Sequence, residues 1–149
     1  MKLTKRLEEA LFKLYSSFHD GTLNPECCNN CAVGNICNNT DSWKHFSNEH
    51  GSLQLNYVGL VHQNLGRTFF GYSPLDLLQI EAEFLKGCGY KIPLNHRNSK
   101  PDLSSNKENL FDGMCAAIEL LCYFDKIDNV MDYYPILDKK VNLEVMEIV

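Results

Sequence analysis

The stretch SPLDLLQIEAEFLKGCG, residues 73–89, decides the fold class because it carries a complete set of helix signals. Ser73 is a favourable N-cap, Pro74 suits the first helical position, and Asp76 places an acid in the first turn. Apolar residues then recur at helical spacing until Gly89 ends the run. The stretch therefore predicts a helix that packs against a core.

Glu81 is the unusual residue of this predicted helix. At about 100° per residue it falls near Leu77, Phe84 and Leu85, on the apolar face. A carboxylate is costly to bury unless it is hydrogen-bonded, so we expect a buried acid with a protein partner such as Arg67 or a tyrosine hydroxyl. The alternative roles are a metal ligand and a general base.

Two other stretches predict long helices. Residues 105–124 begin with a capping box of Ser105 and Glu108 and continue as one apolar stripe. Residues 3–18 place apolar side chains at spacings of three and four. With 44% hydrophobic content in 149 residues, we expect a mainly α-helical, single compact domain over residues 1–149 with about five to six helices.

The remaining segments predict shorter elements. Residues 41–50 suggest a short helical turn, and residues 53–72 fit either a helix or a small β-hairpin because both periods are present. A last short helix is expected before Pro135, and residues 135–149 form a docked or extended tail. No window approaches the roughly 18 apolar residues of a membrane span.

The stretch NPECCNNCAVGNICNN, residues 24–39, places four cysteines within eleven positions. Its opening Asn-Pro pair predicts a helix start. On such a helix Cys27, Cys28 and Cys31 share one face, which we expect to point inward. We expect no secretory leader and therefore a chain in the reducing cytoplasm, where clustered thiols are ligands, redox groups or small core residues.

The spacing of these cysteines favours zinc. Cys28-x2-Cys31, thirteen further residues and His45-x4-His50 fit a tetrahedral site with two cysteines and two histidines. A net charge of -5 and the lack of a finger-like apolar core argue against nucleic acid as the partner. The candidate metal ligands are Cys27, Cys28, Cys31, Cys37, His45 and His50.

Two alternatives to a metal site stay open for the cysteine segment. Cys28-x2-Cys31 at a helix N-terminus is also typical of a redox thiol pair, and the cysteines equally suit close helix packing. The sequence has no glycine-rich phosphate loop, serine nucleophile elbow or paired-carboxylate motif. We therefore expect a binding or interaction module for an unknown protein or small ligand rather than an enzyme.

Four stretches together resemble a group of short bacterial proteins that carry the label of a sodium-translocating NADH-quinone reductase component. They are GTLNPECCNNCAVGNI (21–36), DSWKH (41–45), GYSPLDLLQIEAEFLKGCGY (71–90) and NVMDYY (129–134). That label implies electron transfer through an iron-sulfur ferredoxin domain and a flavin and NADH domain. Here the spacing C-x2-C-x5-C reverses the expected C-x5-C-x2-C, and no flavin-binding pattern is present. We therefore expect no flavin, NADH or iron-sulfur cluster.

Overall fold

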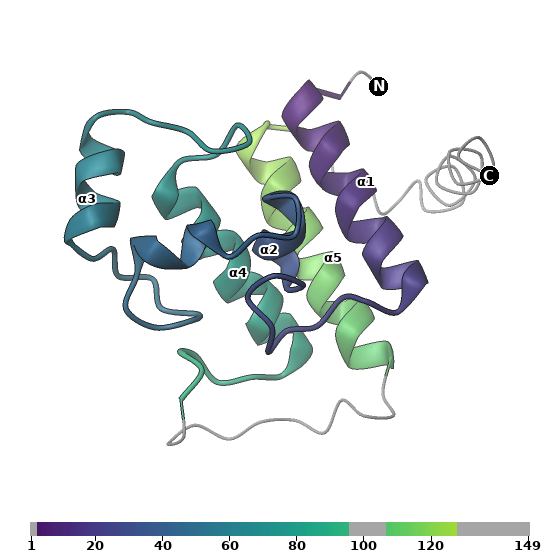
Figure 1. Cartoon of the computed structure of the whole chain (residues 1–149). Helices are drawn as coiled ribbons and strands as arrows, with labels where there is room; N and C mark the ends of the chain where they lie inside the picture. The colour runs from purple at the N-terminus through teal and green to yellow at the C-terminus, as the bar shows by residue number, and fades with distance from the viewer. Residues whose placement is uncertain (1–2, 96–106, 128–149) are drawn as a thin grey trace.

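Two antiparallel helices, α4 (Pro74–Cys88) and α5 (Lys107–Phe124), pack along each other at the centre of the molecule (Figure 1). The computed structural model describes residues 3–95 and 107–127. Helix α4 begins as predicted: the Asp76 N–H donates to Ser73 Oγ at 3.1 Å, and the Ser73 N–H donates to the Asp76 carboxylate at 3.2 Å. The mainly helical fold expected from this stretch is confirmed.

Helix α1 (Lys5–Asp20) covers one side of the central pair and contacts α5. Thr4 caps its start by accepting the Leu7 N–H, and Gly21, at φ +74°, ends it in the left-handed conformation that glycine adopts without strain. The prediction for residues 3–18 is confirmed, with the helix displaced by two residues. The middle of its apolar stripe is buried in the core, and Leu3 and Phe18 at the ends are partly buried against it.

The cysteine segment does not form the predicted helix. Residues 24–31 are turns, and α2 (Ala32–Ile36) begins only after Cys31. The Asn24 side chain accepts the Glu26 N–H at 3.0 Å, and the Asn24 N–H donates to the Asn30 carbonyl at 2.8 Å. Asparagine forms such turns readily, so local side-chain bonds compete successfully with the helix start that Asn-Pro suggests.

Two shorter helices follow, η1 (Ser42–Phe46) and α3 (Tyr57–Asn64). The 3-10 helix η1 accounts for the predicted helical turn and buries Trp43 and Phe46. The alternative of a β-hairpin over residues 53–72 is wrong, because α3 occupies this region. The β-type pairing found there is an isolated bridge between Phe69 and Tyr72. An N-cap bond from the Gly59 N–H to Asn56 Oδ1 at 2.9 Å favours the helix.

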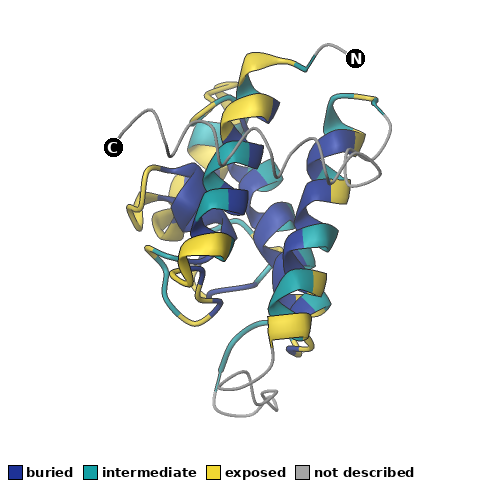
Figure 2. Ribbon diagram, turned by 90° about the vertical axis from the view of Figure 1, so that its right-hand side faces the viewer, coloured by how far each residue is buried: buried dark blue, intermediate teal, exposed yellow. Residues whose placement is uncertain are grey.

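One core joins α1, α2, η1, α4 and α5. Figure 2 shows the buried residues on the facing sides of the helices and the exposed residues on their outer sides. Within the described part of the chain, every helix is too short or too polar to cross a bilayer. The predicted cap at Ser105, the short helix before Pro135 and the tail at 135–149 lie outside the described residues.

Candidate metal centre

Cys31 is the N-cap of α2, and its thiol lies wholly inside the protein. Its backbone is extended, and its Sγ accepts the Gly34 N–H at 3.3 Å. A Cβ at position 34 would lie 2.3 Å from the Cys28 carbonyl oxygen, so only glycine allows the preceding turn to approach α2 this closely. The order of residues in the segment Cys-Ala-Val-Gly therefore fixes the position of the thiol.

Glu81 comes from the middle of α4 and is 0% exposed. One carboxylate oxygen, Oε1, accepts the Val33 N–H of α2 at 3.2 Å. The other, Oε2, lies 2.5 Å from His50 Nε2. The prediction of a buried, partnered acid is confirmed, but the predicted partners were wrong: Arg67 contacts His62 instead.

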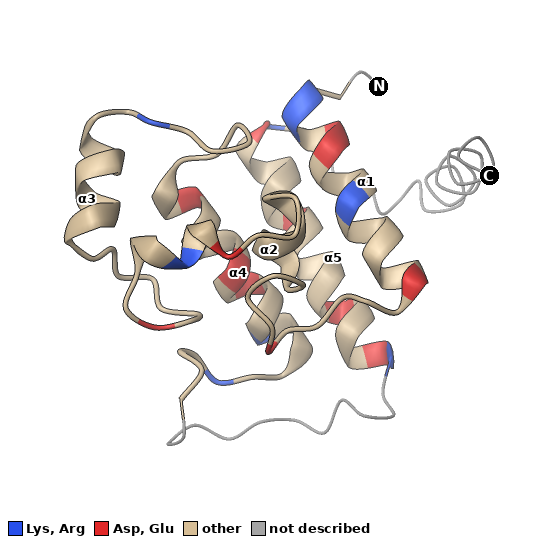
Figure 3. Cartoon of the chain, viewed as in Figure 1, with Lys and Arg blue, Asp and Glu red and all other residues tan. Residues whose placement is uncertain are grey.

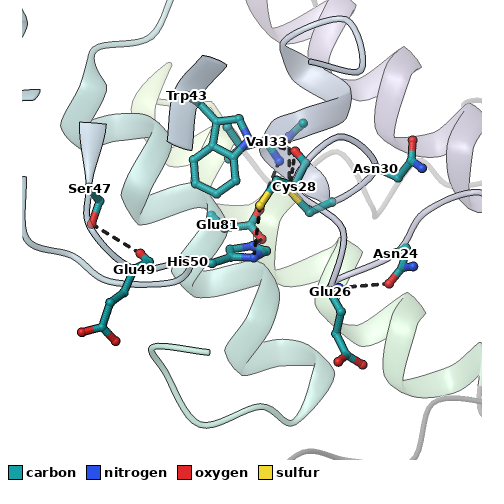
Figure 4. A network of polar contacts seen from close by, with 12 residues as sticks. Asn24, Glu26, Cys28, Asn30, Val33, Trp43, Ser47, Glu49, His50 and Glu81 are labelled. Carbon is teal, nitrogen blue, oxygen red and sulfur yellow. Dashed lines mark hydrogen bonds and ion pairs between the residues drawn. The ribbon is translucent and has the colours of Figure 1, made fainter. Parts of the chain in front are cut away.

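Cys31, His50 and Glu81 bring one sulfur, one nitrogen and one oxygen atom within 4.8 Å of one another. Cys28 lies beside this group, with its Sγ 3.8 Å from His50 Nδ1, the ring nitrogen that does not face Glu81 (Figure 4). The donors come from three parts of the chain: the cysteine turn, the loop after η1, and α4. These three buried side chains are able to hold a metal ion.

Trp43 fixes two parts of this site at once. Its indole Nε1 donates to the Cys28 carbonyl at 3.0 Å, which anchors the cysteine turn to η1. Its ring meets the His50 ring edge-on, with 5.2 Å between centroids. Contacts of this kind orient the ligands of metal sites, and Trp43 is itself held in the core at 1% exposure.

Burial controls the ionisation of both nearby thiols. It raises the pKa of Cys31 well above its usual value, and the Glu81 carboxylate raises this pKa further. Burial also raises the pKa of Cys28, while the Lys44 ammonium opposes that rise. Both thiols therefore stay protonated at neutral pH in the metal-free protein. A bound cation reverses this preference, because a coordinating thiol loses its proton.

The predicted ligands divide into two groups. Cys31 and His50 belong to the site and Cys28 adjoins it, whereas Cys27 is half-buried in the same turn and makes no part of the three-residue group. The other two predicted ligands are elsewhere: Cys37 and His45 line a pocket of about 210 Å³ between η1 and α3. Burial raises the pKa of Cys37 to about 12.

Glu81 is not among the six predicted metal ligands, although a metal-ligand role was one of the alternatives considered for it. Its apolar helical neighbours identified it as a buried acid, but spacing rules for zinc sites consider cysteines and histidines close in sequence. Glu81 lies 31 positions after His50, so only folding brings the two together. The feature of the sequence that points to Glu81 is an acidic residue on the apolar face of a predicted helix.

No protein-family model matches this chain, and comparisons with curated proteins and with solved structures find no match either.

Proposed function

We propose that the protein is a metal-binding module whose centre is formed by Cys31, His50 and Glu81, with Cys28 as the fourth ligand. The observation that carries the proposal is the convergence of three buried ligand atoms, within 4.8 Å, from parts of the chain far apart in sequence. In a tetrahedral zinc site, bond lengths of about 2.0–2.3 Å place ligand atoms about 3.5 Å apart. A closure of about 1 Å brings Cys31, His50 and Glu81 to that separation. Cys28 and Glu81 face opposite nitrogens of the His50 ring, so Cys28 joins the same ion only when that ring turns.

Zinc is the ion that suits these donors. Thiolate sulfur and imidazole nitrogen favour zinc over magnesium or calcium, which prefer oxygen ligands. Two thiolates and one carboxylate carry three negative charges in a buried place, and a divalent cation offsets most of that charge. The ion replaces the proton between His50 and Glu81 and the protons of the two thiols.

The proposed role of the ion is structural. Four protein ligands leave no open position for a substrate, as in structural rather than catalytic zinc sites. The ion joins the cysteine turn and the loop after η1 to α4, so it fastens residues 24–50 to the central helices. The protein then acts as a binding or interaction module. All seven cysteines are free, which fits a reducing cytoplasm.

Metal analysis of the purified, untagged protein tests this function. We expect about one zinc ion per chain. The content should fall below a tenth of that in His50→Gln and Glu81→Gln, and stay unchanged in the matched controls His45→Gln and Glu83→Gln, whose side chains lie outside the site. Circular dichroism of each variant shows whether it is folded. Wild-type protein that neither retains zinc nor takes it up contradicts the proposal.

A second function, thiol chemistry, is supported by one contact. Cys28 Sγ, the His50 ring and Glu81 Oε2 form a row like the nucleophile, base and orienting acid of cysteine enzymes. The raised pKa of Cys28 disfavours this function, since the thiolate is the reactive form. Alkylation of metal-free protein decides between metal binding and thiol chemistry. Thiol chemistry requires Cys28 to be alkylated faster than a cysteine in an unfolded chain, and its alkylation to be slower in His50→Gln.

A further inference from the structure

Helix α3 presents its large apolar side chains to solvent. Tyr57 is 80% exposed, Leu65 at the C-cap is 61% exposed, and the single buried residue of the helix is Gly59. Six of the eight exposed large hydrophobic residues in the described chain fall within thirteen positions here. We call this group the α3 surface; its members are Leu53, Tyr57, Val58, Leu60, Val61 and Leu65.

The attachment of α3 to the rest of the protein explains this exposure. A Cβ at Gly59 would lie 2.4 Å from the Phe46 carbonyl oxygen, so the helix meets η1 through its glycine. At about 100° per residue, Tyr57 and Val61 then lie on the opposite side from Gly59. The apolar side chains that would normally fill a core are directed outward, which is typical of an interaction site.

The α3 surface also lacks charge. Residues 51–66 contain no Lys, Arg, Asp or Glu, although 22% of the chain is charged. In Figure 3 α3 carries no coloured charge, and it lies at the edge of the molecule, away from α1 and α5. Two copies of a chain with net charge -5 repel each other, and an uncharged surface reduces that repulsion where they meet.

Opposite charges lie beyond the two ends of this helix. Glu49 is exposed near the N-terminal end, where Asn56 Nδ2 donates to Asn48 Oδ1 at 3.4 Å. Arg67 is exposed just past the C-terminal end, with its Nη1 3.1 Å from His62 Nδ1. When two such helices lie antiparallel about a two-fold axis, the Arg67 end of one copy meets the Glu49 end of the other.

We propose that the α3 surface binds a second copy of this chain in a symmetric, antiparallel dimer. A two-fold interface is self-complementary, and both the uncharged apolar centre and the opposite charges at its ends meet that requirement. The metal centre is not part of this surface, so the proposal does not depend on the function proposed above. The apolar centre provides affinity, and the pairs of Arg67 and Glu49 fix the antiparallel direction.

Sedimentation equilibrium of the purified protein over a range of concentrations tests the interface. We expect a concentration-dependent dimer. Tyr57→Ser and Leu65→Ser should each weaken it by about tenfold or more, because each removes an apolar contact from the centre. Tyr123→Ser is the matched control, since Tyr123 is 74% exposed on α5, outside the surface, and it should leave the dimer unchanged.

Charge reversal tests the antiparallel arrangement. Glu49→Arg and Arg67→Glu should each weaken the dimer, and the double variant should restore it. Wild-type protein that stays monomeric at every concentration overturns the proposal and leaves the surface to a different protein. Equal weakening by Tyr123→Ser also overturns it, and a double variant no better than the single ones overturns the antiparallel arrangement.

Discussion

Glu81 is the residue on which the candidate site depends. A carboxylate with no exposure is tolerated only when hydrogen bonds offset the loss of water. The Val33 N–H and the His50 ring supply these contacts in the metal-free protein. Removing the carboxylate leaves the Val33 N–H and His50 Nε2 buried without that partner, so the choice of substitution decides the cost.

Glu81→Gln should destabilise the metal-free protein less than Glu81→Leu does. Glutamine keeps an oxygen for the Val33 N–H, whereas leucine leaves that donor and the His50 nitrogen unsatisfied at about 1–3 kcal/mol each. Urea unfolding in the presence of a chelator measures the difference. A leucine variant as stable as the glutamine variant would show that these hydrogen bonds contribute little.

Buried thiols make the stability of the metal-free protein sensitive to alkaline pH. Burial raises the pKa of Cys88 to about 12 from an ordinary value of 9.0. The unfolded chain therefore loses this proton first, and stability falls as the pH rises from about 9 towards 12. Cys88→Ala should flatten the fall measured by urea unfolding between pH 8 and 11. An unchanged slope would show that Cys88 does not titrate in this way.

At the scale of elements, the contact between α4 and α5 depends on glycine. A Cβ at Gly113 would lie 2.2 Å from Cys88 Sγ and 2.7 Å from the Phe84 carbonyl oxygen. A Cβ at Gly87, on the other helix, would lie 2.8 Å from the Gly113 Cα. The two helices therefore approach with backbone against backbone, which leaves no room for a side chain.

Gly113→Ala should lower the free energy of unfolding by up to about 2 kcal/mol. Alanine gains about 1 kcal/mol in helix propensity, but overpacking against a backbone oxygen costs about 1–3 kcal/mol or more. Thermal unfolding beside the exposed α5 control Glu119→Ala gives the comparison. An increase in Tm for Gly113→Ala would mean that the helices separate without cost.

Sequence patterns predicted the long helices well because the signals for them are local. The caps at Ser73 and Gly21 and the apolar periods of α1 and α4 act within a few residues. The turn at residues 24–31 was mispredicted as helix because Asn24 binds its own backbone neighbours. Periodicity left α3 ambiguous because its apolar residues face solvent instead of a core.

At the scale of the whole molecule, an ion pair joins the first helix to the end of α5. Arg6 Nε and Nη2 donate to Asp125 Oδ1 at 2.8 and 2.5 Å, and the guanidinium lies 4.6 Å from the Tyr72 ring centroid. The two residues are 119 positions apart, and the side chain of Asp125 is 2% exposed. This contact joins the start of α1 to the residues that follow the end of α5.

Asp125→Asn should destabilise the protein by about 1–2 kcal/mol, because a nearly buried charged hydrogen bond is weakened. Glu83→Gln is the matched control, since the pair of Glu83 with Lys86 is about half exposed and should change stability by less than about 0.5 kcal/mol. Urea unfolding compares the two. Equal effects would show that the Arg6 contact adds no more than a surface pair.

The candidate site is also a property of the whole molecule. The cysteine and histidine spacing included Cys31 and His50, which the fold brings together, but it could not exclude His45 or Cys37, which line another pocket. Glu81 was recognised as buried without its partner. Each of these distinctions depends on how α4 meets the cysteine turn, and no local pattern contains that information.

A cobalt titration of the metal-free protein tests the metal centre most directly. Cobalt substitutes for zinc and absorbs visible light strongly when its coordination is tetrahedral, with a separate band from thiolate sulfur. We predict saturation at about one cobalt ion per chain, with the thiolate band lost in Cys31→Ser and kept in Cys37→Ser. Folded wild-type protein that shows no such bands, or a thiolate band indifferent to Cys31→Ser, would contradict the account.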